Sequence, residues 1–227
     1  MPAEPEAFTV PFLGLTGGLG SGKSTALRLL GELGCATISA DGIVHDLYRG
    51  DALRALVVER WGDGILDASG AIDRSAIAER VFPEPSEREW LQSQIWPLVG
   101  QAIWAFRQAS EAAARADQTC GDGTELVGTP HLPAWPRAAI VETPLLFEAG
   151  MEGMYDATVA VIAPERVRAE RAAARGHAAV DERSAAQLTQ AEKAERADHV
   201  VDNDDTEQRL RERLATLLDS ILPEPVR

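Results

Sequence analysis

The sequence predicts an α/β protein, a three-layer αβα domain in which helices cover both faces of a parallel sheet. Strand-sized apolar runs alternate with helix-period stretches along the chain. The runs 138–142 and 157–162 are almost continuously apolar, as is typical of central parallel strands that are buried on both faces. A chain of 227 residues, 45% of them hydrophobic, can form one such domain with insertions.

The first predicted strand, 10–16, leads through a glycine-rich loop into a helix that ends at Gly34. The loop Gly17–Ser24 matches GxxxxGK[ST], a pattern whose glycines let successive backbone N–H groups turn toward phosphate oxygens. A P-loop NTPase core that binds a nucleoside triphosphate, expected to be ATP, is therefore predicted. Its nucleotide-binding residues are expected to be Gly18, Gly20, Ser21, Gly22, Lys23, Ser24 and Thr25.

The second predicted strand, 36–40, ends at Asp41, and an almost entirely helical stretch follows it. Helices are expected over 51–61, from an N-cap at Asp73, and over 86–115 with an interruption at Pro97. This stretch, 42–116, is predicted to be a helical insertion that binds the acceptor.

The rest of the chain returns to alternating strands and helices. Residues 117–136 are expected to be a surface loop, 165–175 and 181–196 charged helices, 200–201 a short strand and 205–222 a closing amphipathic helix. The predicted parts are a core (8–41, 137–165 and 195–227), the insertion (42–116), the loop (117–136) and a lid (166–194).

Composition excludes several functional classes. The net charge of −14 argues against nonspecific binding to nucleic acid, which needs a basic field. Apolar runs are too short for a membrane span, and the acidic N-terminus is unlike a signal peptide. The cysteines Cys35 and Cys120 form no CxxC pair, so a disulfide or a zinc site is not expected. A cytoplasmic location is expected instead. The oligomeric state stays open.

Two classes of P-loop protein remain to be separated, a small-molecule kinase and an NTP-binding regulatory module. A guanine-specific switch is excluded because neither lysine, Lys23 nor Lys193, follows an asparagine in an NKxD pattern. In a kinase, Asp41 at the carboxyl end of its strand is placed to accept the proton of the acceptor hydroxyl. The alternative role for Asp41 is the N-cap of the next helix.

Other side chains suit the same chemistry. Ser24 and Glu142 are the candidate ligands of Mg²⁺, in the manner of a P-loop hydroxyl and a strand-end acid. Arg171 and Arg175 are four residues apart and share a helix face, so a lid with a hinge at Gly176 can bring them to the phosphates. The alternative is a helix face that only contacts water.

Several separated blocks of the chain resemble the dephospho-coenzyme A kinase family. Residues 14–25 are similar to its LTGGIGSGKST block, and the segment 40–44 resembles the end of its second strand. The segment 72–74, with the Val81-Phe82 pair, resembles its insertion helix, and the segment 144–148 reads PLLFE as in the family. Gln187, Lys193 and the segment 197–203 resemble its terminal Q…K…AD-V-IDN block.

The resemblance implies transfer of the γ-phosphate of ATP to the 3′-hydroxyl of dephospho-coenzyme A, the last step of coenzyme A synthesis. It implies that Lys23, Asp41, Arg171 and Arg175 are catalytic. It further implies that Asp41 and the PLLFE block bind the acceptor through Pro144, Leu145, Leu146, Phe147 and Glu148. The chain departs from the family pattern in having Ser39, Trp96 and Glu142 where an acid, a histidine and an aspartate are common.

Overall fold

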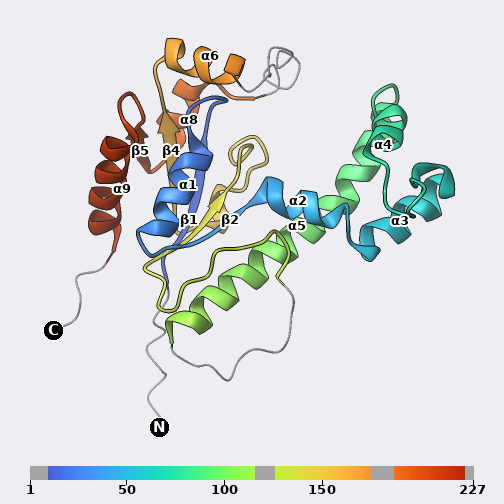
Figure 1. Cartoon of the computed structure of the whole chain (residues 1–227), viewed down its shortest axis with the longest axis horizontal. Helices are drawn as coiled ribbons and strands as arrows, with labels where there is room; N and C mark the ends of the chain where they lie inside the picture. The colour runs from blue at the N-terminus through green and yellow to red at the C-terminus, as the bar shows by residue number, and fades with distance from the viewer. Residues whose placement is uncertain (1–9, 116–125, 175–186, 223–227) are drawn as a thin grey trace, which may run out of the picture.

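The computed structural model describes residues 10–115, 126–174 and 187–222 and contains a five-stranded parallel sheet (Figure 1). The strand order is β2-β3-β1-β4-β5. Every pairing is parallel, as predicted for a doubly wound α/β core. The strands are β1 (Phe12–Gly17), β2 (Ala36–Ser39), β3 (Ala139–Glu142), β4 (Ala157–Ile162) and β5 (His199–Asp202).

Alternation of side chains along the strands creates the three predicted layers. In β3, Ala139 and Val141 face one hydrophobic cluster, whereas Ile140, like Ala138 just before the strand, faces the other. On the second face pack α1 (Lys23–Glu32) and α9 (Glu207–Ile221). The first face is covered by α2 (Ala40–Leu47) and α5 (Pro85–Ala114), which lies on the other side of the sheet in Figure 1.

The described part of the predicted insertion is helical. It comprises α2, α3 (Asp51–Trp61), the short helix η1 (Asp63–Ile65), α4 (Arg74–Val81) and α5. Asp73 caps α4 as predicted, because its carboxylate accepts from the backbone N–H groups of Ser75 and Ala76. Figure 1 shows α3 and α4 at the end of α5 farthest from the sheet.

The predicted interruption at Pro97 is wrong, because α5 runs through it from Pro85 to Ala114. Proline removes one backbone donor and crowds the preceding turn. Burial of Val99, Ile103 and Phe106 on the same helix provides the packing that outweighs this local cost.

The predicted helix over 181–196 is confirmed at 190–196 but wrong at its described start. Residues 187–189 are not helical, and α8 begins only at Gln190 and ends at Arg196. Thr189 accepts from the N–H of Glu192 while the Glu192 side chain accepts from the N–H of Thr189, so a capping box fixes this start. The segment before it is outside the described residues.

The loop expected to be a surface excursion has a structural role in its described part, 126–136. His131 pairs with Thr37 through backbone hydrogen bonds in both directions, of 2.8 and 2.9 Å. The backbone N–H of Gly128 donates to a carboxylate oxygen of Asp46 at 3.0 Å. The loop therefore covers the outer edge of β2, which would otherwise expose unpaired backbone groups.

Cys35 is fully buried, as expected for a small core residue. Burial raises the pKa of its thiol to about 12, so the thiol stays protonated at neutral pH. Cys120 lies outside the described residues.

Strand register brings the predicted site residues to one edge of the sheet. Ser39 of β2 and Glu142 of β3 are paired, and Gly17 at the end of β1 is paired with Val161 of β4. These strands end together, so the phosphate loop, Glu142 and the start of α2 all lie at the carboxyl edge, where open parallel sheets bind ligands.

Candidate active site

The phosphate loop connects β1 directly to α1, as the sequence predicts. Gly20 and Gly22 have positive φ angles of 73° and 94°, which favour glycine over other residues. A Cβ at Gly20 would stand 2.5 Å from the backbone oxygen of Arg168, and one at Gly22 would stand 2.1 Å from Nδ2 of Asn203. These two glycines therefore allow neighbouring elements to pack tightly on the loop.

Lys23 begins α1 and turns its side chain back over the loop. Its Nζ donates to the carbonyl oxygens of Gly17 and Gly18, each at 3.0 Å. Burial lowers the pKa of Lys23 below its ordinary value of 10.5, while the nearby carboxylates of Glu142 and Asp41 act in the opposite direction. The ammonium group is thus held by the loop carbonyls, with two acids near enough to act on it.

Asp41 and Glu142 occupy different environments near this lysine. Asp41 is exposed and lies in the first turn of α2, whose N-cap is Ser39, so the helix-cap alternative for Asp41 is not what the fold uses. Glu142 is 6% exposed at the end of β3. An exposed carboxylate can meet an incoming hydroxyl, and a buried one beside a lysine is fixed in place.

The arginines of α6 (Glu165–Ala174) differ in what their side chains contact. Arg166 pairs with Glu170, and both side chains are exposed, so this part of the helix only contacts water. Arg168 donates from Nε to the carbonyl oxygen of Leu19 at 2.9 Å and from Nη1 to Glu165. It therefore holds the phosphate loop against α6.

Arg171 lies closer to the phosphate position. Its Nη1 is buried, has no hydrogen-bond partner among the described residues and lies 3.5 Å from where a Cβ on Gly22 would stand. A buried guanidinium N–H that lacks an acceptor is costly, and an anion beside Gly22 would supply one. Arg175, predicted to share this helix face, lies outside the described residues, as does the predicted hinge at Gly176.

Asn203 is a further loop contact, and it comes from the opposite end of the chain. It follows β5 directly, is 4% exposed and donates from Nδ2 to the carbonyl oxygen of Ser21 at 2.7 Å. Sequence reasoning assigned no role to Asn203 or Arg168. Their positions near the carboxyl ends of β5 and β4 are the feature that could have indicated one.

The PLLFE segment (144–148) is held by α8. Lys193 is fully buried, donates to the carbonyl oxygen of Pro144 and pairs with Glu148 at 2.9 Å. The same Glu148 oxygen, Oε1, accepts from the N–H of Leu188 at 2.8 Å. Lys193 is also close enough to Lys23 to contribute to the lowered pKa of Lys23.

Within this segment the side chains differ in what they offer a ligand. Leu146 and Phe147 are 0% and 4% exposed and belong to the hydrophobic core, whereas Leu145 is 37% exposed. Their predicted contact with the acceptor stays a prediction. The buried side chains of Leu146 and Phe147 anchor the segment that follows β3.

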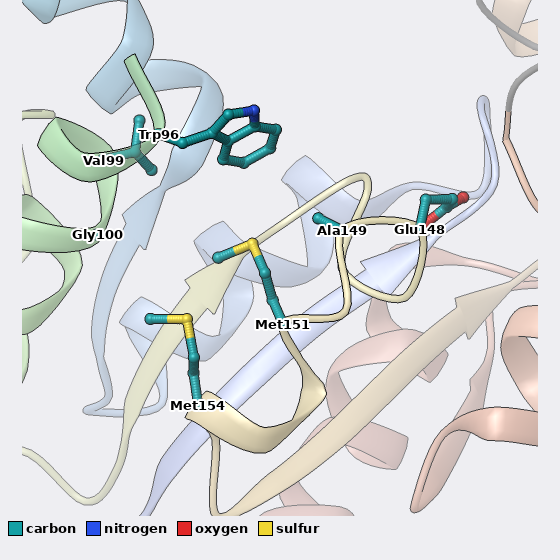
Figure 2. A pocket seen from close by; sticks show the side chains of 7 residues that line it. All are labelled: Trp96, Val99, Gly100, Glu148, Ala149, Met151 and Met154. Atoms are coloured by element: carbon teal, nitrogen blue, oxygen red, sulfur yellow. The ribbon is translucent and has the colours of Figure 1, made fainter. Parts of the chain in front are cut away.

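Beside the PLLFE segment lies a pocket of about 470 Å³ between α5 and the chain that returns from β3 to β4. Figure 2 shows Trp96 and Val99 on one side of it, and Ala149, Met151 and Met154 on the other. Gly100 and Glu148 complete the lining. The size is in the range of small-molecule sites.

Comparison with known protein families matches residues 11–117 and 131–208 to the dephospho-CoA kinase family model. The chain belongs to the dephospho-CoA kinase family. It is 36% identical over 196 residues to the dephospho-CoA kinase of a Synechococcus strain, which covers 84% of each chain. It is 33% identical over 218 residues to that of Bradyrhizobium diazoefficiens, covering 95% of this chain and 98% of the relative.

Solved structures share the fold of this chain. A crystal structure of a Thermus thermophilus protein superposes with a TM-score of 0.72 at 26% identity and covers 95% of this chain and 99% of the other. Dephospho-CoA kinase from Campylobacter jejuni matches the fold with a TM-score of 0.58 at 21% identity, covering 93% and 97% of the two chains. The predicted α/β kinase fold is therefore confirmed.

For this dephospho-CoA kinase family member, the predicted site residues fall into two sets. The phosphate loop, Lys23, Asp41, Glu142 and Arg171 come together at the carboxyl edge of the sheet. Pro144 to Glu148 lie beside them, tied to Lys193. Within the described residues, no helix is long and apolar enough to cross a membrane.

Proposed function

We propose that the chain transfers the γ-phosphate of ATP to the 3′-hydroxyl of dephospho-coenzyme A, completing coenzyme A, with Mg²⁺ as the metal. The observation that carries this proposal is the buried, partnerless Nη1 of Arg171 beside Gly22. Lys23 and Arg171 approach the phosphate loop from α1 and α6, so two cations converge where a transferring phosphate would lie.

ATP is expected to displace Lys23 from the loop carbonyls. Lys23 donates to Gly17 and Gly18 in the structure, and phosphate oxygens are stronger, charged acceptors for the same ammonium group. The loop N–H groups and the N-terminus of α1 then bind the phosphates. In the transition state, Lys23 and Arg171 neutralise charge on the phosphoryl oxygens.

Asp41 is the proposed base. It is exposed at the carboxyl edge near Lys23, where an acceptor hydroxyl can approach in line with the phosphate. Its carboxylate would orient the 3′-hydroxyl and take its proton as the new O–P bond forms.

The donor set at this edge fits Mg²⁺. Ser24 offers an exposed hydroxyl and Glu142 a carboxylate, both hard oxygen ligands. Within the described residues, no group of three or more histidine, cysteine, aspartate or glutamate side chains could hold a metal by itself. This agrees with an ion that completes its shell with phosphate oxygens and water. When bound, Mg²⁺ would neutralise charge on the β- and γ-phosphates.

An acceptor screen tests the proposal. ADP release by the purified chain, with ATP and Mg²⁺, is compared for dephospho-coenzyme A, adenosine, AMP, thymidine and uridine. We expect turnover with dephospho-coenzyme A to exceed that with every other acceptor, and the product to carry a 3′-phosphate by mass spectrometry and NMR. Preferred phosphorylation of a nucleoside, or no transfer to any acceptor, would refute the assignment.

A further inference from the structure

We propose that the pocket between α5 and residues 148–154 binds the pantetheine arm of the acceptor, the neutral tail that extends from its diphosphate. This inference rests on the proposed function and deepens it, because it assigns a subsite to one part of the substrate. Figure 2 shows Trp96 and Val99 on the α5 side of the pocket, Ala149, Met151 and Met154 on the other side, and Glu148 beyond Ala149.

The positions of Glu148 and Met154 indicate which part of the acceptor would occupy the pocket. Glu148 follows β3 and is tied to Lys193 near the phosphate site, whereas Met154 lies just before the start of β4 at the opposite edge of the sheet. Six residues of β4 span roughly 20 Å at about 3.3 Å per residue. The pocket therefore runs away from the reacting phosphate. An extended tail can follow that path, while the base stays attached to the ribose that carries the reacting hydroxyl.

The chemistry of the lining selects a neutral, partly aliphatic group. Trp96, Val99, Met151 and Met154 present an indole, a branched alkyl group and two thioethers. Glu148 is the charged residue of the lining, and its Oε1 is engaged by Lys193 and the N–H of Leu188. A diphosphate would find no free cation among these residues. The flexible thioethers of methionine adapt well to methyl groups and a thiol.

The exposed fractions of the lining side chains show which of them a ligand can contact. Trp96 and Met154 are 43% and 40% exposed although both are large and apolar. Gly100 lies on α5 in the same lining, and a Cβ built on it would meet no heavy atom within 4 Å. Glycine inside a helix costs stability relative to alanine, so the open space at Gly100 fits a ligand-binding role.

Gly100→Leu tests the inference by adding a side chain where a Cβ would meet no heavy atom within 4 Å, so it removes no existing side-chain contact. Gly64→Leu is its matched control. A Cβ at Gly64 also meets nothing within 4 Å, and Gly64 lies in η1, outside the pocket. Trp96→Ala enlarges the pocket on the same α5 wall, one helical turn from Gly100, and gives a second change of opposite sense.

Calorimetry measures binding of two probes to each variant while a nonhydrolysable ATP analogue saturates the nucleotide site. The probes are dephospho-coenzyme A and ADP-ribose, which keeps the adenosine diphosphate half and lacks the arm. We expect Gly100→Leu and Trp96→Ala to weaken dephospho-coenzyme A by about tenfold or more, the usual scale for a changed apolar pocket. Binding of ADP-ribose should change by less than about twofold, and Gly64→Leu should affect neither probe.

Two results would overturn the inference. Equal weakening of both probes would place the nucleoside in the pocket, and unchanged binding of dephospho-coenzyme A in both variants would show that the pocket is not a subsite. The acceptor screen separates this failure from failure of the proposed function. A wild-type chain that phosphorylates dephospho-coenzyme A while Gly100→Leu binds it normally refutes the subsite alone.

Discussion

At the scale of single residues, Lys23 shows how the site prepares for phosphate. Its ammonium group is buried, engages two loop carbonyls and has two acids nearby. The sequence predicted a phosphate-binding role for this lysine, and in the structure its side chain folds back over the loop. A charge already desolvated by the protein needs little reorganisation when the reaction begins.

Lys23→Met is expected to lower turnover by about 10²- to 10³-fold or more, since it removes charge stabilisation from the transition state. The melting temperature should stay within a few degrees of the wild type. Burial lowers the pKa of Lys23, which means that the folded state disfavours its charged form. Removing this charge stabilises the fold and offsets the loss of the two hydrogen bonds that Lys23 makes. Thermal melting and the ADP-release assay measure both effects. Near-normal turnover in a folded variant would exclude this lysine from catalysis.

The pH dependence of activity tests whether Glu142 and Asp41 act on the pKa of Lys23. The ammonium form of Lys23 is lost as pH rises through its lowered pKa, so kcat/KM for ATP should fall on the alkaline side earlier than for an ordinary lysine. Glu142→Gln removes the larger of the two carboxylate effects that raise this pKa, and should move the alkaline limb to lower pH. Asp41→Asn should move it less. A limb that stays in place in both variants contradicts the assignment of that limb to Lys23.

Asp41 has a distinct test in kcat. Asp41→Asn should lower kcat by about 10²-fold or more while the affinity for ATP changes little, the usual contribution of a general base. Ser39→Ala is the matched control, because Ser39 occupies the N-cap of the same helix and its side chain makes no capping hydrogen bond. If Asp41→Asn retains turnover, orientation of the hydroxyl by other groups must suffice.

At the scale of elements, α8 links two parts of the site through a buried ion pair. Lys193 and Glu148 are 0% and 13% exposed. Lys193→Met alone should lower the free energy of unfolding by about 3–5 kcal/mol, because it leaves a buried carboxylate without its partner. The double variant Lys193→Met/Glu148→Leu should lose less, since both charges are gone. Chemical denaturation measures each, and a double variant no more stable than the single one would contradict this account.

Sequence patterns predicted most elements because they depend on local periodicity. Apolar runs located all five strands, and the cap at Asp73 marked its helix. The interruption predicted at Pro97 was wrong because long-range packing carries α5 through it. The backbone pairing of β2 with His131 likewise depends on contacts that local periodicity does not reveal. Asn203 and Arg168 could not be assigned from spacing, because only the folded sheet brings them to the phosphate loop.

At the scale of the whole molecule, an acidic chain gathers its cations where anions must bind. The net charge is −14, yet Lys23, Arg168 and Arg171 meet at the phosphate loop from two separate helices. Long-range repulsion between chain and nucleotide is screened within about 10 Å at 0.1 M salt, whereas buried contacts are screened much less. We therefore expect recognition of phosphate to depend on this local cluster.

The predicted lid provides the final test, since α6 carries part of that cluster. The stretch 166–194 is expected to become more protected from hydrogen exchange when an ATP analogue and dephospho-coenzyme A are both bound, because phosphates would supply the acceptor that Nη1 of Arg171 lacks. The helix α9 packs beside α1 and carries none of the proposed site residues, so it should serve as an internal control. Arg171→Ala should abolish the added protection and lower turnover by at least about tenfold, whereas Arg166→Ala, whose pair is exposed, should leave both unchanged. Unchanged exchange on double occupancy would reduce Arg171 to a structural contact of α6.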